Sequence, residues 1–77
     1  MKVALLMGSD SDMKRLEPCL EVLAGLEIPY VARVLSAHRT PQALVAFVQQ
    51  EAPALTVRVF ICAAGGAAHL AGVVAAH

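Results

Sequence analysis

The sequence carries few charged side chains and no excess of either sign. Asp, Glu, Lys and Arg make up 16% of its 77 residues, and six basic residues balance six acidic ones, so that the formal net charge is zero. It has no run of basic residues, which argues against nucleic acid or an anionic membrane surface as the main partner. Hydrophobic residues amount to 58%, which excludes a disordered chain, because disordered segments are poor in apolar surface.

The large apolar fraction raises the question of how so short a chain covers it. The length allows one small domain, and a domain of roughly 60 residues buries only about 60% of the surface of its unfolded chain. We therefore expect apolar surface to remain, to be covered either by a partner or by other parts of a longer domain.

Cysteines are also few. The chain has only Cys19 and Cys62 and no Cys-x-x-Cys motif, so that it lacks the disulfide framework of small secreted domains. The neighbours of both residues are apolar. We expect buried free thiols in a protein of the reducing cytoplasm.

The sequence pattern indicates neither a signal peptide nor a transmembrane segment. The apolar run at Val3–Met7 is followed at once by acidic residues, too early for a signal peptide. Residues 59–77 contain no Asp, Glu, Lys or Arg and are long enough to span a bilayer. However, this stretch is rich in Ala and Gly, and Gly65-Gly66 and His69 interrupt it. We predict a buried strand, a turn and a helix there, and no membrane segment.

Hydrophobic patterning predicts three strands that alternate with three helices. Residues 3–7 form a continuous apolar run, which is typical of a strand buried on both faces of a parallel sheet. Residues 30–35 and 56–62 are the other two expected strands, because they are rich in β-branched and aromatic side chains. The order β-α-β-α-β-α predicts an α/β fold with a parallel sheet between layers of helices, three layers in all, as in flavodoxin-like and Rossmann-like proteins.

The first predicted helix has apolar residues at Met13, Leu16, Leu20 and Leu23, all on one face. Its start lies among the Ser and Asp residues of positions 9–12, which are suited to capping, and Gly25 lies near its end. Pro18 is expected to kink a helix that begins near residue 12.

The second predicted helix begins with Thr40 as its N-cap and Pro41 in its first position, and it ends before Pro53. Its buried stripe is Leu44, Phe47 and Val48. The third helix is expected at residues 67–77 and stops without a cap. Three strands are few for such a sheet, so we predict that residues 1–77 form a single α/β domain that is the N-terminal part of a longer one.

Most polar and glycine residues suited to chemistry follow the three predicted strands, in the segments 8–12, 36–41 and 64–69. Ligands of open α/β sheets bind at the carboxyl ends of the strands, near a change in strand order. We therefore predict that these three loops form one site.

The first loop, Gly8-Ser9-Asp10-Ser11-Asp12, offers a glycine that lets the backbone approach a ligand, two hydroxyls and free amides at a helix N-terminus. Such a terminus favours anions such as phosphate, whereas the two carboxylates suit hydroxyl groups such as those of a ribose. Ordinary helix capping accounts for the same residues. Neither a Walker loop nor a Gly-x-Gly-x-x-Gly motif is present.

The second loop places an imidazole beside a guanidinium. Arg39 could bind a phosphate through paired donors, and His38 could transfer a proton near neutral pH. The alternative is a solvated histidine next to an arginine that pairs with a carboxylate.

In the third loop, Gly65-Gly66 would let a planar ring lie close to the backbone, or would simply make a tight turn. His69 is more often a capping or core residue than a ligand. No cysteine or carboxylate stands at metal-ligand spacing from the three histidines, His38, His69 and His77, so we predict no metal site.

Taken together, the three loops resemble one known family. Met7-Gly8-Ser9-Asp10-Ser11-Asp12, Ser36-Ala37-His38-Arg39-Thr40-Pro41 and Ala64-Gly65-Gly66-Ala67-Ala68-His69-Leu70 resemble the motifs of the bacterial-type N5-carboxyaminoimidazole ribonucleotide mutases, the catalytic subunit of phosphoribosylaminoimidazole carboxylase. The likeness covers the whole chain and the first half of the usual family domain. Animal-type carboxylases are less similar, because they tend to have His-Lys-Gly-Pro in the second motif.

The resemblance implies an isomerase of purine biosynthesis that moves a carboxylate from N5 to C4 of an aminoimidazole ribonucleotide, without metal or organic cofactor. It implies a cytoplasmic homo-oligomer, an octamer in this family. Carried over by position, Ser9, Asp12 and Arg39 would bind the ribose phosphate and His38 would be the general acid–base. The wall of the pocket would include Ser11, Ser36, Ala37, Gly65, Gly66 and His69.

Two positions depart from the family pattern. Met13 stands where the family commonly has Trp, and Ala71 where it commonly has Pro; both changes are expected to alter packing more than chemistry. The second half of the family domain supplies further strands and a loop that completes the site of a neighbouring subunit. A chain that ended at residue 77 is therefore predicted to be inactive.

Two other functions remain open on the sequence. The first is a ribonucleotide-binding or merely assembling fragment without catalysis. The second is an aminoimidazole ribonucleotide carboxylase that uses free CO2 in place of the carboxylated substrate.

Overall fold

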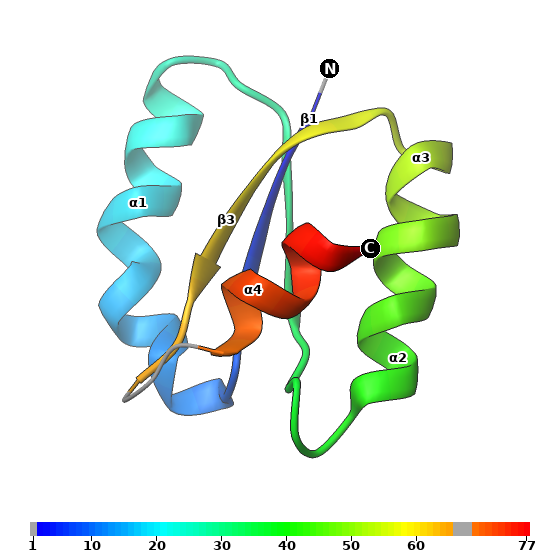
Figure 1. Cartoon of the computed structure of the whole chain (residues 1–77). Helices are drawn as coiled ribbons and strands as arrows, with labels where there is room; N and C mark the ends of the chain where they lie inside the picture. The colour runs from blue at the N-terminus through cyan, green and yellow to red at the C-terminus, as the bar shows by residue number, and fades with distance from the viewer. Residues whose placement is uncertain (1, 66–68) are drawn as a thin grey trace.

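A computed structural model of the chain describes residues 2–65 and 69–77. The strands are β1 (Lys2–Met7), β2 (Tyr30–Val34) and β3 (Val57–Ala63), and the α-helices are α1 (Met13–Gly25), α2 (Pro41–Ala46), α3 (Ala52–Ala54) and α4 (His69–Ala76). A 3-10 turn, η1 (Asp10–Asp12), leads into α1, and a π turn, η2 (Phe47–Glu51), joins α2 to α3. The predicted alternation of strands and helices is confirmed (Figure 1).

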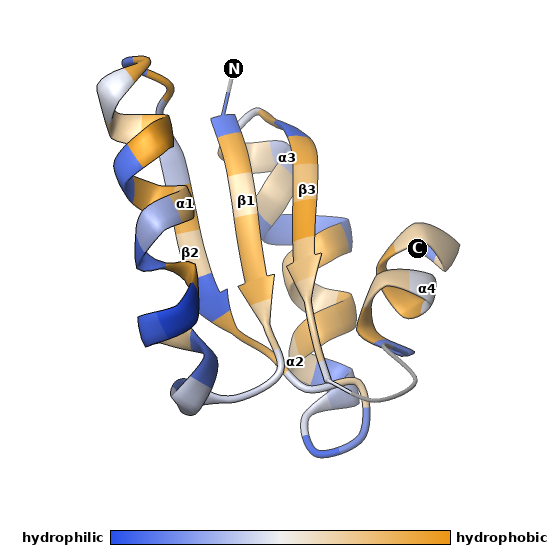
Figure 2. Ribbon diagram, turned by 90° about the vertical axis from the view of Figure 1, so that its left-hand side faces the viewer, coloured by the Kyte–Doolittle hydropathy of each residue, from blue (hydrophilic) through white to orange (hydrophobic). Residues whose placement is uncertain are grey.

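The sheet is parallel, and within the described residues its strand order is β2-β1-β3. The first strand of the chain therefore lies in the centre, hydrogen-bonded on both sides. All of Val3–Met7 is buried, because a central strand is covered by its neighbours at the edges and by helices on both faces. The continuous apolar run in this segment is thus explained by position, and the strand stands out as hydrophobic in Figure 2.

Helices cover the sheet on both sides, which confirms the three-layer α/β fold. In Figure 1, α1 lies on one side of the sheet, and α2 and α3 lie on the other. A hydrophobic cluster of buried residues joins this second layer to the sheet. It consists of Ala4 and Leu6 from β1, Leu44, Phe47 and Ala52 from the α2–α3 segment, and Leu70 and Val74 from α4. Successive side chains of a strand alternate between the faces, so that Val3, Leu5 and Met7 face α1.

Helix α1 presents the predicted apolar face to the sheet. Leu23 is buried, and Met13, Leu16 and Leu20 are half-buried. Pro18 lies inside this helix. Because proline has no N–H group, it donates no backbone hydrogen bond to the preceding turn. The proline is on the exposed side, where water can satisfy the carbonyl left without a donor.

Gly25 lies at the end of α1, as expected. This glycine is the last residue of the helix, whereas the left-handed conformation falls on Glu27, with φ of 58°. The amide of Glu27 donates to the carbonyl of Ala24 at 3.0 Å, and the amide of Ile28 donates to that of Leu23 at 2.9 Å. These two bonds are the Schellman pattern, which satisfies the last carbonyls of a helix and usually places glycine where Glu27 stands.

The prediction that the second helix ends before Pro53 is wrong. The helical segment continues through η2 and includes Pro53 in α3. A π turn bonds each residue to the fifth one along the chain instead of the fourth, and this widening relieves the clash of a proline ring with the carbonyl four residues earlier. The segment ends at Leu55, and Thr56 takes the left-handed conformation with φ of 58°.

The thiols are free, as predicted, but they are half-buried rather than buried. Partial burial raises the pKa of Cys62, because the thiolate loses hydration there. The predicted start of the third helix at residue 67 lies outside the described residues, and α4 is described from His69 onward. Among the described helices, none is both long enough and apolar enough to cross a membrane.

Apolar surface remains uncovered, as the composition suggests. Exposed large apolar side chains lie on α1 and on both outer strands of the sheet. They are Val22, Leu26, Tyr30, Val34 and Val59. Single exposed residues of this kind are ordinary, but edge strands also present unpaired backbone N–H and C=O groups, which native proteins usually protect or cover.

The buried cluster predicts a strong effect for one substitution. Leu44 is fully buried between α2 and the sheet, so that Leu44→Ala should lower the free energy of unfolding by about 2–5 kcal/mol through lost burial and a cavity. Leu26→Ala is the matched control, because this leucine is 65% exposed, and it should change stability by less than about 0.5 kcal/mol. Urea unfolding followed by circular dichroism measures both. Equal losses would show that the core lies elsewhere.

Candidate functional site

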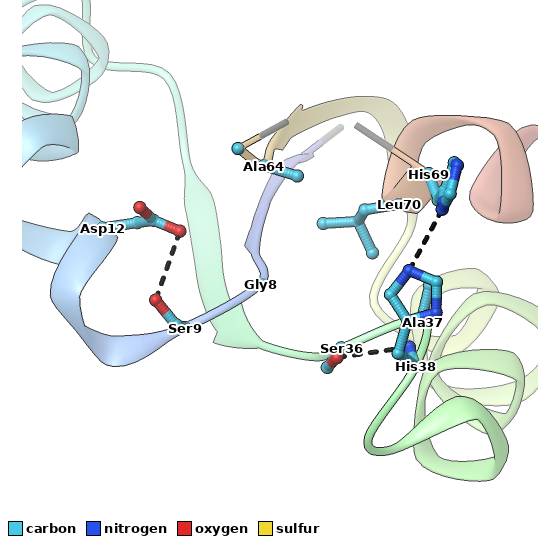
Figure 3. Close-up of a pocket in the computed structure, with 10 residues that line it drawn as sticks. Gly8, Ser9, Asp12, Ser36, Ala37, His38, Ala64, His69 and Leu70 are labelled. Atoms are coloured by element: carbon cyan, nitrogen blue, oxygen red, sulfur yellow. Dashed lines mark hydrogen bonds between the residues drawn. The ribbon is translucent and has the colours of Figure 1, made fainter. Parts of the chain in front are cut away.

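The three loops that follow the strands lie at one edge of the sheet, as predicted. The chain leaves β1 to one side to form β2 and then crosses to the other side to form β3, so that the change of strand order lies between β1 and β3. Ligand sites of open α/β sheets lie outside the strand ends at such a point. A cavity of about 500 Å³ opens there (Figure 3). Its lining comes from all three loops: Gly8, Ser9, Asp12, Ser36, Ala37, His38, Ala64, Gly65, His69 and Leu70.

The first loop is held by its own serine hydroxyls. Ser9 Oγ lies 2.8 Å from Ser11 Oγ and donates to Asp12 Oδ2 at 3.5 Å. Neither Ser9 nor Asp12 makes a side-chain capping bond to the helix that follows it, so capping does not explain these residues. In Figure 3 the two side chains lie next to each other on one side of the cavity. There the Ser9 hydroxyl can donate to a phosphate or a hydroxyl group, and the Asp12 carboxylate can accept from a hydroxyl group.

The second loop is a tight turn organised by Ser36. The hydroxyl of Ser36 accepts hydrogen bonds from the amides of His38 at 3.2 Å and of Arg39 at 3.0 Å. Thr40 precedes α2 as predicted, but it makes no side-chain capping bond. Its hydroxyl is bonded to the backbone of Ser36 instead. Pro41 takes the first helical position, as predicted.

Arg39 connects the second loop to the first. Its Nη2 donates a hydrogen bond of 3.0 Å to the carbonyl oxygen of Gly8. The guanidinium is exposed and bonded to this carbonyl rather than to a carboxylate, so that the paired-arginine alternative does not describe it. A guanidinium has five N–H donors, and the remaining ones are available to an anion at the edge of the cavity.

His38 and His69 come together from segments 31 residues apart. His38 Nε2 lies 3.1 Å from His69 Nδ1, and the rings meet edge to face with centroids 5.1 Å apart and planes inclined by 69°. A hydrogen bond between these nitrogens needs one donor and one acceptor, so the tautomer of one neutral ring determines that of the other. His69 is the first residue of α4 and is exposed, so it is not a core histidine.

Glycines leave room for a ligand on the floor of the cavity. Gly8 and Gly65 both line the cavity, and a Cβ atom at either position would meet nothing within 4 Å. The predicted role of Gly66 lies outside the described residues.

Most of the predicted site residues line this cavity, with two exceptions. Ser11 and Arg39 do not line it, but each is hydrogen-bonded to a residue that does. Leu70 is a lining residue that we did not predict as part of the site, and it is buried. Its position directly after His69 at the start of an apolar helix was the signal available.

Within residues 2–65 and 69–77, no group of three His, Cys, Asp or Glu side chains could hold a metal ion.

The cavity therefore has two chemically different sides. In Figure 3 the hydroxyl and carboxylate of Ser9 and Asp12 lie on one side, and the imidazoles of His38 and His69 lie on the other. The first side can bind a polar group, and the second can move a proton. Between them, Gly8, Ala64 and Leu70 form an apolar floor with room for a flat ring.

Comparison with known proteins assigns the family. A family model described as AIR carboxylase matches residues 2–77. The chain belongs to the AIR carboxylase family. Among its relatives, the N5-carboxyaminoimidazole ribonucleotide mutase of Aliivibrio fischeri is 46% identical over 76 residues, which are 99% of this chain and 47% of the relative. The mutase of Brucella melitensis is 49% identical over 96% of this chain and 45% of its own length.

Two further relatives show the range of this family. The phosphoribosylaminoimidazole carboxylase of Schizosaccharomyces pombe is 43% identical over 96% of this chain, but only 13% of that longer protein is covered. The crystal structure of a PurE2 variant from Treponema denticola superposes with a TM-score of 0.85 at 35% identity, and it covers 96% of this chain and 48% of that one. The chain thus spans about half the length of the mutases it matches.

The contact between the two histidines can be tested in solution. Replacing His69 by alanine removes the partner of His38 Nε2, so that the ¹⁵N resonance of this nitrogen should shift toward that of an imidazole bonded only to water. His77→Ala is the control, because His77 contacts Gln49. A His38 spectrum that is the same in the wild type and in the His69→Ala variant would contradict the contact.

Proposed function

We propose that this chain is the substrate-binding and proton-transferring part of an N5-carboxyaminoimidazole ribonucleotide mutase, an isomerase of purine biosynthesis. The observation that carries the proposal is the single cavity that unites the three motifs of the chain. The names of its relatives, at 46% and 49% identity, support the same activity. The substrate would be a small ribonucleotide, and the reaction would require no metal or organic cofactor.

The polar side of the cavity is suited to the ribose phosphate. The Asp12 carboxylate would accept hydrogen bonds from ribose hydroxyls, and the Ser9 hydroxyl would donate to the phosphate ester. Arg39 offers further N–H donors beside them. Charge-assisted bonds from a guanidinium to a phosphate are among the stronger polar contacts in proteins. We assign substrate binding to these three residues, with Ser11 supporting Ser9 through their hydroxyl contact.

The imidazole side is suited to the proton transfers that the reaction needs. His38 would donate a proton to N5 as the N–C bond breaks and CO2 leaves. After C4 attacks CO2 and forms the new C–C bond, His38 would remove the proton that C4 carries. The proton given to nitrogen is thus recovered from carbon, and the ring regains its aromatic character. His69 holds the His38 ring through the bond at 3.1 Å, while Gly65 and Leu70 form the wall beside which CO2 would remain.

We further propose that residues 1–77 belong to one longer α/β domain that forms a cytoplasmic homo-oligomer. The outer strands with exposed Tyr30, Val34 and Val59 and the coverage of about half of each mutase relative support this. An octamer is the expected state, and the mass of the native assembly tests it.

The general acid–base role predicts a selective loss for His38→Asn. This substitution keeps a polar side chain that cannot exchange protons in the same way, so that turnover should fall by roughly 10²–10⁴-fold, while ribonucleotide affinity changes little. The readouts are a turnover assay with the carboxylated substrate and a titration with aminoimidazole ribonucleotide. The matched control is His77→Asn, which should keep the wild-type rate. A near-normal rate in His38→Asn would refute the assigned role.

The phosphate contact predicts the opposite pattern for Arg39→Ala. Here the affinity for the ribonucleotide should fall by about tenfold or more, because a charge-assisted bond contributes about 1.5–3 kcal/mol. Arg58→Ala is the control, since Arg58 is exposed on β3, outside the cavity lining. Calorimetric titration measures both variants. Unchanged affinity in Arg39→Ala would show that the guanidinium does not contact the substrate.

The same turnover assay and ribonucleotide titration distinguish two alternative functions. Saturable binding of the ribonucleotide without product would indicate a binding fragment. The relative named phosphoribosylaminoimidazole carboxylase favours testing free CO2 as well. Product from aminoimidazole ribonucleotide and bicarbonate, in the absence of the carboxylated substrate, would indicate the carboxylase.

A further inference from the structure

The turn that carries His38 and Arg39 is closed by the hydroxyl of Thr40. Thr40 Oγ1 accepts a hydrogen bond from the amide of Ser36 at 2.9 Å and donates one to the carbonyl oxygen of Ser36 at 3.2 Å. The amide of Thr40 donates to the same carbonyl at 3.0 Å. One hydroxyl thus binds both backbone groups of the residue that opens the turn, which requires a group that can donate and accept at once.

Ser36 in turn fixes the backbone of His38 and Arg39. Its own hydroxyl accepts the bonds from the amides of His38 and Arg39 at 3.2 and 3.0 Å. Thr40 therefore holds the backbone of Ser36, and the side chain of Ser36 holds the backbone of the two residues between them. The result is a ring of hydrogen bonds that joins both ends of the turn.

Packing cannot replace these bonds, because the turn lies at the surface. His38, Arg39 and Thr40 are exposed, and Ser36 and Ala37 are only half-buried. Both functional side chains nevertheless reach fixed partners on other segments. His38 meets His69 at the start of α4, and Arg39 meets the carbonyl of Gly8 after β1. A change in the shape of the turn would move both contacts together.

We propose that Thr40 is a positioning residue of the site, whose hydroxyl holds the Ser36–Thr40 turn in the shape that presents His38 and Arg39. The proposal rests on the function proposed above for these two residues. An ordinary N-cap role does not account for Thr40, since its side chain makes no capping bond to α2. Its hydroxyl acts on the turn before the helix and not on the helix.

The test compares three variants in the natural protein that carries this chain. Thr40→Val keeps the shape of the side chain and removes the hydroxyl, while Thr40→Ser keeps the hydroxyl. Thr56→Val is the matched control, because Thr56 also bonds a backbone carbonyl, that of Leu55 at 2.6 Å, and precedes β3 at the opposite edge of the sheet. These are the only two threonines in the sequence.

Kinetic measurements with the carboxylated substrate are the first readout. Thr40→Val should lower kcat and raise KM, with a loss of roughly 10-fold to 100-fold in kcat/KM, because small displacements of catalytic groups have effects of this size. Thr40→Ser should remain within about threefold of the wild type and Thr56→Val within about twofold, on the same grounds. A Thr40→Val enzyme with normal kinetics, or a Thr40→Ser enzyme as impaired as Thr40→Val, would overturn the proposal.

Amide hydrogen exchange is the second readout and does not depend on activity. In the wild type the amides of Ser36, His38 and Arg39 should be protected, and in Thr40→Val all three should exchange faster by about tenfold or more, because an exposed turn opens locally once its bonds are removed. Unprotected amides in the wild type would overturn the proposal even if Thr40→Val failed to fold. Protection that depends on Thr40 in a protein without turnover would instead refute the proposed function and leave the constraint on the turn in place.

Discussion

The structure depends on one constraint, the parallel pairing of β1 with a neighbour on each side. Together with the helices on both faces, this pairing buries all of Val3–Met7, so that only an apolar run can occupy the position. It also brings the carboxyl ends of β1, β2 and β3 to one edge. The exit to β2 on one side and to β3 on the other creates the change of strand order at which α/β sheets bind ligands. The cavity follows from the topology, and the residues that come directly after each strand provide its chemistry.

The site itself is held by polar bonds between exposed loops rather than by the core. Arg39 bonds the carbonyl of Gly8, His38 bonds His69, and Thr40 bonds Ser36. Each bond adds little to stability at the surface, since a net hydrogen bond contributes about 0.5–1.5 kcal/mol. These bonds matter for geometry, because they place an imidazole and a guanidinium around a cavity with an apolar floor. A ligand that binds there can use the free donors of Arg39 without breaking its contact to the first loop.

Patterns along the sequence predict the parts of this structure that depend on local rules. The apolar run of β1, the alternation of elements and the three loops at the strand ends all follow from periodicity and from parallel topology. The predicted helix end before Pro53 is wrong, because a π turn precedes this proline and lets the helical segment continue through it. The sequence places Thr40 correctly at the N-cap of α2, but a capping pattern does not reveal that the hydroxyl bonds the backbone of Ser36 instead of α2. The contact of His38 with His69 spans 31 residues and depends on where α4 begins against the sheet, which no local pattern encodes.

The central claim is that three loops, separate in sequence, form one ribonucleotide site. The most direct measurement is a titration of the isotope-labelled natural protein with aminoimidazole ribonucleotide, followed by the shifts of backbone amide resonances. We expect saturable shifts in all three segments, 8–12, 36–41 and 64–69, with one common dissociation constant. Shifts confined to a single loop, or centred on the outer faces of α1 and α2, would contradict it.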